Sequence, residues 1–290
     1  MKYTHQGDMM IKTNKKEDYS PETLKHLHEV QLMMLKDFIE LCEKYDITYF
    51  MDGGSLLGCI RHGGFIPWDD DIDIILFRED YEKFLKYSHE LSAKYDIINS
   101  DNYEYYCRLY TKLSLKETRN YDFFERNTDF IFGINIDIFV FDNIPNGKIK
   151  KNLFKIHYEI FKKFLFLYEI TTCDVYLSKN KEKIGHFIRA LFKLLHINNK
   201  TLKKMGSKLI TKSINADSDY IFNLSTSYNF DAFNKNIFKK SKKVKFETLN
   251  VNIPLGFDEY LTQIYGNYME IPPKDKQVNH GFEKIDFGKY

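Results

Sequence analysis

A cluster of four aspartates lies at Asp69, Asp70, Asp71 and Asp73, directly before an apolar run that ends at Leu76. If the chain is extended from Asp71 onward, the side chains of Asp71 and Asp73 project from one face, about 7 Å apart. Two carboxylates held in this way repel each other unless a cation lies between them, and Mg²⁺ prefers such oxygen ligands. The pattern predicts a metal site suited to phosphate chemistry, with Mg²⁺ as the cofactor and Mn²⁺ as the alternative.

Two other interpretations apply to the same cluster. Aspartates often gather in a solvated turn, and Pro67 and Trp68 just before them fit a loop. A calcium-binding loop that starts at Asp69 would need Gly at its sixth position and Glu at its twelfth. The chain has Ile74 and Asp80 there, which excludes the calcium loop.

The segment upstream of the cluster combines a strand, a glycine turn and a helix. Residues 47–51 read as a strand, Gly53, Gly54 and Ser55 follow, and residues 56–61 read as a short helix that Ser55 could cap. Glycines let the backbone approach a ligand closely, and free N–H groups at a helix start bind anions. Such a turn is weak evidence alone, but followed by the aspartates it has the order of a nucleotidyltransferase site, with Gly54 and Ser55 at the phosphates.

A third carboxylate is expected from a neighbouring strand. Asp137 lies within residues 132–141, an almost wholly apolar run that is typical of a central strand. A buried carboxylate is costly unless it ligates a cation or pairs with a base. Asp137 is therefore predicted to complete the metal site or to pair with a base. The alternative is a salt-bridged core aspartate.

These residues resemble the signature of a known family. The continuous segment 50–73 resembles that of the LicD family, bacterial phosphotransferases that decorate surface glycans with phosphocholine and are related to the eukaryotic fukutin-related proteins. The family usually has Thr where this chain has Ser55, and both side chains carry a hydroxyl. The likeness continues at residues 136–139 with Asp142, and at residues 258–261, 265–269 and 272–273.

The resemblance implies a fold, a reaction and its partners. The expected fold is α/β, a nucleotidyltransferase-like mixed sheet flanked by helices, with a helical insertion. The expected reaction is Mg²⁺-dependent transfer of a phosphoalcohol from a CDP-alcohol donor to a hydroxyl of a glycan or glycolipid acceptor. Asp71 and Asp73 would hold the metal, Asp137 would complete the metal site or take the proton of the acceptor, and Asp69 would lie just behind them.

Basic side chains must offset the remaining charge of the diphosphate. Arg61 follows the short helix, while Arg108 and Lys112 alternate with apolar residues as strand residues do and would then share a face. Most Arg and Lys residues are surface cations, which is the alternative for each of them. Arg61 and Lys112 are favoured because they lie in segments that resemble the family.

Composition is consistent with an enzyme of the cytoplasm. The chain has 290 residues, of which 43% are hydrophobic, and its four cysteines show no metal-binding spacing. The first twenty residues lack the apolar core of a signal peptide, and no apolar run approaches the roughly 20 residues of a membrane span. These observations predict a cytoplasmic protein.

Two helices at the ends of the core are clearly marked. Ser20 can cap a helix that has Pro21 at its first position and apolar residues at helical spacing up to Cys42. Phe257 to Tyr265 reads as a helix that stops at Gly266. The tail beyond it could close over the site, with His280 as a substrate contact or an ordinary surface histidine.

The middle of the chain is strongly basic. Residues 148–212 hold sixteen Lys and Arg and four acids, a net charge of +12 in a chain of +2. Apolar residues mark two helical stripes, at Leu153, His157, Ile160, Phe161, Phe164 and Tyr168, and at Ile184, Phe187, Ile188, Leu191, Phe192 and Leu195. Such helices suit an anionic membrane surface or an anionic glycan, or else a helical subdomain with solvated lysines. The sequence shows no nucleic-acid-binding motif, so no nucleic-acid partner is expected.

The predicted organisation has four parts: a polar tail at 1–19, a catalytic core at 20–147, a basic helical insertion at 148–235 and the rest of the core at 236–290. The protein is expected to work in the cytoplasm, with peripheral contact at the inner face of the membrane. Two other functions remain open. One is a nucleotidyltransferase that releases pyrophosphate, and the other is a non-catalytic nucleotide- or metal-binding protein of the same fold.

Overall fold

The structure is a computed structural model. It describes residues 19–103, 106, 108–121, 132–172, 187–188, 190–198, 201–202, 204–206, 208, 218–225, 232–279, 281 and 284–290. The predicted tail at 1–19 therefore falls outside the described residues except for Tyr19, which is buried.

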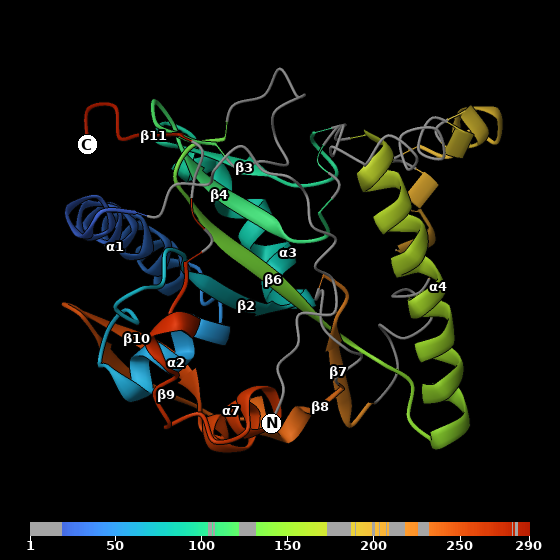
Figure 1. The fold of residues 1–290 in the computed structure, drawn as a ribbon. Helices are drawn as coiled ribbons and strands as arrows, with labels where there is room; N and C mark the ends of the chain where they lie inside the picture. The colour runs from blue at the N-terminus through green and yellow to red at the C-terminus, as the bar shows by residue number, and fades with distance from the viewer. Residues whose placement is uncertain are drawn as a thin grey trace.

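The centre of the described structure is a seven-stranded mixed sheet (Figure 1). Its main path has the order β1-β2-β6-β4-β3, and β7 and β8 extend it from the end of β6. Strands β2 and β6 are parallel, and the other neighbours are antiparallel. The strands are β1 (Tyr49–Met51), β2 (Asp73–Phe77), β3 (Tyr95–Ile98), β4 (Thr111–Leu115), β6 (Asn135–Asn143), β7 (Tyr220–Asn223) and β8 (Phe233–Asn234).

The central strands are apolar on both faces. Ile74, Ile75 and Leu76 of β2 are fully buried although consecutive side chains point to opposite faces of a sheet. Both faces must therefore be covered, and helices α1 (Pro21–Lys44) and α3 (Arg78–Tyr87) pack against β2 and β6. The α/β fold class predicted from the sequence is confirmed.

Helix α1 begins and packs as predicted. The Ser20 hydroxyl accepts a hydrogen bond from the Thr23 N–H at 3.2 Å, and Pro21 occupies the first helical position. The apolar stripe from Leu24 to Cys42 is buried in the main core. A short 3₁₀ helix, η1 (Ser88–Leu91), follows α3.

The C-terminal part joins the same core. Strands β9 (Ser241–Phe246) and β10 (Leu249–Pro254) form an antiparallel hairpin, and α7 spans Phe257–Tyr265. Helix α7 ends at Gly266, whose φ of 69° suits glycine, so the predicted helix and its end are confirmed. The remaining elements are η3 (Lys235–Phe238), η4 (Lys274–Lys276), and β5 (Arg119–Tyr121), which pairs with β11 (Lys284–Asp286).

The basic middle begins with one long helix, α4 (Lys148–Thr172), which stands beside β7 at the right of Figure 1. Among its described side chains Phe154, Tyr158 and Phe161 are buried, whereas Leu153 and Ile160 are exposed, so the predicted stripe combines one buried residue, Phe161, with residues of an exposed side. In the second stripe only Phe192 is buried, and Ile184 lies outside the described residues.

Strands β7 and β8 lie within the segment predicted as an insertion, yet β7 pairs with β6 and β8 with β7. The central sheet therefore includes residues 220–223 and 233–234. None of the helices formed by the described residues is both long and apolar enough to cross a bilayer. Cys42 and Cys59 are free and buried, while Cys107 and Cys173 lie outside the described residues.

Candidate functional site

Two of the predicted carboxylates come from neighbouring parallel strands. Asp73 opens β2 and is the register partner of Asp137 on β6. The Asp137 N–H donates to the Ile72 carbonyl at 2.9 Å, which continues the ladder beyond the first residue of β2. Regular strand starts at Asp73, so Asp71 lies just before it. The sheet thus places the backbones of Asp73 and Asp137 side by side.

Asp73 is in an environment that disfavours its charge. Burial raises the pKa of its carboxyl well above the usual range, and the negative charges of Asp71, Asp137, Asp52 and Asp69, in that order, raise it further. Like charges that converge on a buried acid are a recognised mark of functional sites.

The start of helix α2 (Gly53–Arg61) adjoins these acids. Asp52 is the N-cap, and its carboxylate accepts from the Gly53 N–H at 2.7 Å and from the Tyr260 hydroxyl. Burial raises the pKa of Asp52 to about 6 against these two hydrogen bonds. The cap expected at Ser55 was wrong, because the helix begins at Gly53, three residues before the predicted start at Leu56, and Asp52 caps it.

Ser55 has a different contact. Its hydroxyl oxygen is buried inside α2 and accepts the Asp73 N–H at 2.9 Å. This bond joins the helix to the first residue of β2, and it leaves the hydroxyl hydrogen of Ser55 to donate elsewhere. Its predicted role at the phosphates stays a prediction.

Gly53 and Gly54 are needed for close approach. A Cβ on Gly54 would lie 2.5 Å from Asp69 Oδ2, and one on Gly53 would lie 3.4 Å from Asp73 Oδ2 and 3.6 Å from the Tyr265 hydroxyl. Gly53 also has a φ of +47°. Any other residue at position 54 would displace the Asp69 carboxylate. The predicted glycine turn therefore lets the start of α2 lie close to Asp69, Asp73 and Tyr265.

Asp69, Asp70 and Asp71 each offer an oxygen within 4.8 Å of the others. Helix α1 holds their backbone: His28 Nε2 lies 2.7 Å from the Asp69 carbonyl, and the Gln31 amide donates to the Asp70 carbonyl at 3.0 Å. The His28 ring stacks on Phe65 with its centroid 3.8 Å away. The aspartate loop is therefore fixed by partners about forty positions earlier in the chain.

This donor set fits a divalent cation. The acids supply only oxygen atoms, which is the chemistry that Mg²⁺ and Mn²⁺ accept. A cation would also favour the charged form of Asp73, which burial and its neighbours oppose. Asp71, Asp73 and Asp137 remain the predicted ligands.

Lys112 lies inside the site, on β4. Its ammonium is 3.1 Å from Asp137 Oδ1, and the two side chains are each only 13% exposed. The Asn135 amide donates to the same oxygen at 2.7 Å. Lys112 is thus paired with a site carboxylate, while its predicted contact with a phosphate stays a prediction.

The two arginines are placed differently. Arg61 Nη1 donates to the Tyr268 carbonyl at 2.9 Å and the Glu270 carbonyl at 3.2 Å, so it holds the segment after α7. Arg108 is half-buried and precedes β4, which starts only at Thr111. The strand-like alternation expected through Arg108 was therefore wrong, and the phosphate roles of both arginines stay predictions. His280 lies outside the described residues.

Several site residues escaped the sequence reasoning. Tyr260 and Tyr265 reach Asp52 and Gly53 from α7, and His28, Gln31 and Asn135 support the acids. The tyrosines lie in a segment that resembles the family, which was the available signal. His28 and Gln31 had none, because their partners are backbone carbonyls.

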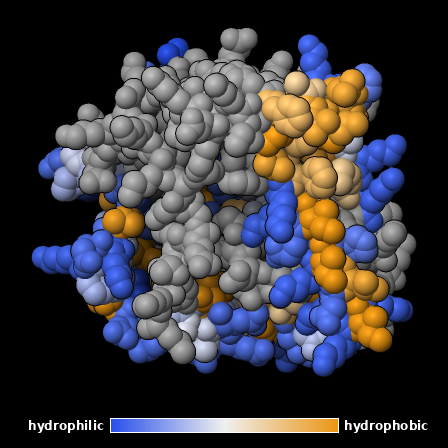
Figure 2. Space-filling view, turned by 45° about the vertical axis from the view of Figure 1, so that its right-hand side comes forward, coloured by the Kyte–Doolittle hydropathy of each residue, from blue (hydrophilic) through white to orange (hydrophobic). Residues whose placement is uncertain are grey.

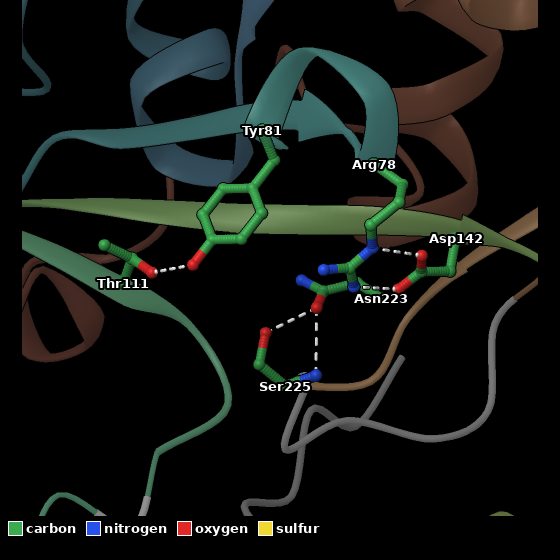
Figure 3. Close-up of polar contacts among 6 residues, drawn as sticks. All are labelled: Arg78, Tyr81, Thr111, Asp142, Asn223 and Ser225. Carbon is green, nitrogen blue, oxygen red and sulfur yellow. Dashed lines mark hydrogen bonds and ion pairs between the residues drawn. The ribbon is translucent and has the colours of Figure 1, made fainter. Parts of the chain in front are cut away.

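A second polar cluster lies at the opposite ends of β2 and β6 (Figure 3). Arg78 binds Asp142 through two hydrogen bonds, of 2.8 and 2.6 Å, and Tyr81 contacts Thr111 at 2.6 Å. Arg78 directly follows β2 as the first residue of α3, and Asp142 lies five residues beyond Asp137 on β6, so their ion pair is at the far end of the two strands from the acids. Thr111 lies nearer to the acids, because its register partner is Ile138.

Comparison with known proteins gives a consistent result. A family model described as "LicD/FKTN/FKRP, nucleotidyltransferase domain" matches residues 46–177. The lipopolysaccharide cholinephosphotransferase LicD of Haemophilus influenzae is 31% identical over 273 residues, covering 90% of this chain and 97% of that protein. The mouse ribitol 5-phosphate transferase FKRP is 45% identical over 42 residues, 14% of this chain and 8% of that protein.

Proposed function

Because this chain belongs to the LicD family of phosphotransferases, we propose that it transfers a phosphoalcohol from a CDP-alcohol to a hydroxyl of a glycan or lipid-linked saccharide. The observation on which this rests most is the register pairing of Asp73 with Asp137 beside the start of α2. The relative from Haemophilus influenzae, a cholinephosphotransferase that acts on lipopolysaccharide, supports a phosphocholine-like group and a glycan acceptor.

The reaction balances as a single displacement at phosphorus. The acceptor hydroxyl oxygen forms a bond to the phosphorus that bears the alcohol. The bond from that phosphorus to the bridging oxygen breaks, and CMP leaves with the electron pair. The hydroxyl proton passes to a base. Positioning and neutralisation of charge provide most of the catalysis in reactions of this type.

Each group of site residues has a proposed role that follows from its position. Asp71, Asp73 and Asp137 would hold the divalent cation, which when bound neutralises phosphate charge; the charges of Asp71 and Asp137 both act on Asp73. The start of α2 lies beside Asp69 and Asp73, and its backbone N–H groups would bind phosphate oxygens near Gly54. Lys112 lies within reach of the same region through its pairing with Asp137.

Asp137 is the preferred base for the acceptor proton if it is not fully engaged with the cation. Its Oδ1 is held by Lys112 and Asn135, and these contacts fix the orientation of the second oxygen. Asp69, whose carboxylate lies against Gly54, is the other acid at the phosphate-binding end.

Product analysis tests the proposal. Purified protein is incubated with Mg²⁺, a glycan acceptor and, in turn, CDP-choline, CDP-ribitol and CDP-glycerol. We expect CMP and a glycan whose mass has increased by the phosphoalcohol, with one donor clearly preferred. Release of pyrophosphate from CTP with nucleotide left on the acceptor would instead indicate a nucleotidyltransferase. Donor binding without any product would indicate a binding protein of the same fold.

We also place the reaction in the cytoplasm, with the protein peripherally attached to the inner face of the membrane. The support is the net charge of +12 over residues 148–212, because each lysine near anionic lipid contributes about 1 kcal/mol. A lipid-linked acceptor would then be within reach of the site.

A further inference from the structure

Helix α4 has two apolar sides, of which the protein covers one. The covered side consists of Phe154, Tyr158 and Phe161. Phe154 and Tyr158 pack on Phe222 of β7, with ring centroids 6.1 and 4.7 Å apart. This side accounts for the attachment of α4 to the sheet, so the other apolar residues of the helix are not needed for that purpose.

The uncovered side is a row of four aliphatic residues, which we name the α4 stripe. Its members are Ile149 (77% exposed), Leu153 (50%), Ile156 (54%) and Ile160 (48%). Their spacing places them on one line along the helix, opposite the covered side. Figure 2 shows an orange stripe of this kind between blue flanks. Single exposed aliphatic residues are ordinary, but a continuous row marks an interaction surface.

The borders of the α4 stripe are basic. Lys148, Lys150, Lys155 and Lys163 are exposed, and helical geometry places Lys163 on one side of the stripe and Lys150 on the other. Lys151 and Lys162 differ, because their ammonium groups lie over the rings of Tyr220 and Tyr158. The acids of the helix are Glu159 and Glu169. An apolar row with a lysine on each side, Lys150 and Lys163, is the pattern of a helix that lies flat on an anionic lipid surface, and Glu159 is the acid on the Lys163 side.

We propose that the α4 stripe and its flanking lysines dock on the surface of a bilayer that contains anionic lipid. The aliphatic side chains enter the boundary between headgroups and acyl chains, and the lysines contact the lipid phosphates. A second copy of the chain is a poorer occupant, because a two-fold contact through the stripe would place the lysines of one copy against those of the other. The biological purpose of this docking, access to a lipid-linked acceptor, rests on the proposed function.

Co-sedimentation with vesicles tests the proposal. The full chain is mixed with vesicles of phosphatidylcholine alone, or of phosphatidylcholine with phosphatidylglycerol, at low and high salt and without donor. We expect binding only to the anionic vesicles and its loss at high salt. Lys150→Gln with Lys163→Gln should weaken binding at least about tenfold, given the contribution of a lysine near anionic lipid. Leu153→Gln with Ile156→Gln should weaken it to a similar extent, because the apolar contact is lost.

Matched variants serve as controls. Leu255 is 52% exposed, close to Leu153, but lies in the turn before α7, so Leu255→Gln should leave binding within about twofold of wild type. Lys25→Gln with Lys239→Gln removes two exposed charges elsewhere and should also have little effect. Circular dichroism confirms that each variant is folded.

Three results would overturn the proposal. They are no vesicle binding, equal binding to neutral and anionic vesicles, and equal losses in the α4 and control variants. A dimer in light scattering that Leu153→Gln with Ile156→Gln abolishes would assign the stripe to a second copy. Because no donor is present, these results bear on docking alone, and a failure of docking leaves the transfer reaction to be judged by its products.

Discussion

At the scale of single residues, the protein keeps a carboxylate where it costs stability. Asp73 is buried among the charges of four other aspartates. Its backbone is held by two hydrogen bonds: the Ser55 hydroxyl accepts its N–H, and the Asp52 N–H donates to its carbonyl. Without a cation, folding must either desolvate this charge or protonate it. Such a cost is reasonable only if the carboxylate has a function.

We therefore predict opposite effects of Asp73→Asn on stability and activity. The neutral amide avoids the desolvation and repulsion that raise the pKa of Asp73, so the melting temperature without metal should rise. Transfer should fall at least about 100-fold, because charge at the cation is lost. Thermal denaturation in chelator and a turnover assay measure the two effects. A mutant with near-normal turnover would remove Asp73 from the site.

His28 provides a test by pH. Burial lowers the pKa of its imidazole, although the Asp69 carbonyl partly opposes this. The unfolded chain, in which histidine has a pKa of about 6.5, then takes up the proton first, so the folded protein loses stability as the pH falls below about 6.5. His28→Gln keeps an amide N–H for the Asp69 carbonyl but cannot titrate, and should give a shallower slope.

The free energy of unfolding of both proteins, measured in urea from pH 7 to pH 5, shows the difference in slope. The slope contributed by one group cannot exceed about 1.4 kcal/mol per pH unit. His89→Gln, at an exposed position, is the control and should follow wild type. Parallel curves for wild type and His28→Gln would show that His28 does not titrate between the folded and unfolded states.

At the scale of elements, the parallel pair β2 and β6 is polar at both ends and apolar between them. The acids lie at one end, and at the other end Arg78, directly after β2, pairs with Asp142 of β6. Asp142 is only 5% exposed and Arg78 26%. The ion pair joins the start of α3 to β6. The hydrogen bonds of Arg78 drawn in Figure 3 go to Asp142.

Arg78→Ala should therefore reduce stability without changing the chemistry. The loss leaves Asp142 buried without its partner, which should lower the free energy of unfolding by about 2–4 kcal/mol. Urea denaturation measures this value, and Mg²⁺ affinity should be unchanged. Lys36→Ala is the control, because the exposed pair of Lys36 with Glu40 should contribute less than about 0.5 kcal/mol. A loss in Arg78→Ala no larger than in the control would contradict a structural role for the ion pair.

Arg61 links two elements, α2 and the segment after α7, and its predicted role at the donor can be separated from that link. Arg61→Ala should weaken CDP-alcohol binding by about 1.5–3 kcal/mol if the guanidinium makes a charge-assisted bond to the diphosphate. Arg61→Gln can still donate to the carbonyls of Tyr268 and Glu270 but has no charge. If Arg61→Gln has the wild-type melting temperature and the wild-type affinity for the CDP-alcohol, measured by calorimetry, then Arg61 acts only by holding the segment after α7.

Local sequence patterns predicted the elements better than their faces and contacts. Capping and stop residues correctly marked α1 and α7, because those signals act within a few positions. The start of α2 was missed although its cap, Asp52, is itself a local signal, and the covered side of α4 could not be predicted from local signals. The Ser55 hydroxyl accepts a hydrogen bond from the Asp73 N–H. The buried side of α4 packs on Phe222, which is more than fifty positions away in the sequence.

At the scale of the whole molecule, the site is assembled from segments far apart in the chain. Helix α1 holds the aspartate loop, β2 and β6 supply Asp73 and Asp137, and α7 brings Tyr260 to Asp52 across 208 positions. The acids themselves were predictable, because their types and spacing indicate cation chemistry without any partner. The supporting residues were not, because backbone carbonyls and distant tyrosines leave no pattern in the sequence.

The proposed reaction requires above all that these acids form a single divalent-cation site. Titration calorimetry with Mg²⁺ and with Mn²⁺ tests it without knowledge of the alcohol or the acceptor. We predict saturable binding to wild type, its loss in Asp73→Asn and in Asp137→Asn, and wild-type binding in Asp80→Asn, which removes a partly buried acid on α3. Cation binding that survives both site substitutions, or no binding to wild type in the presence of a CDP-alcohol, would contradict the account.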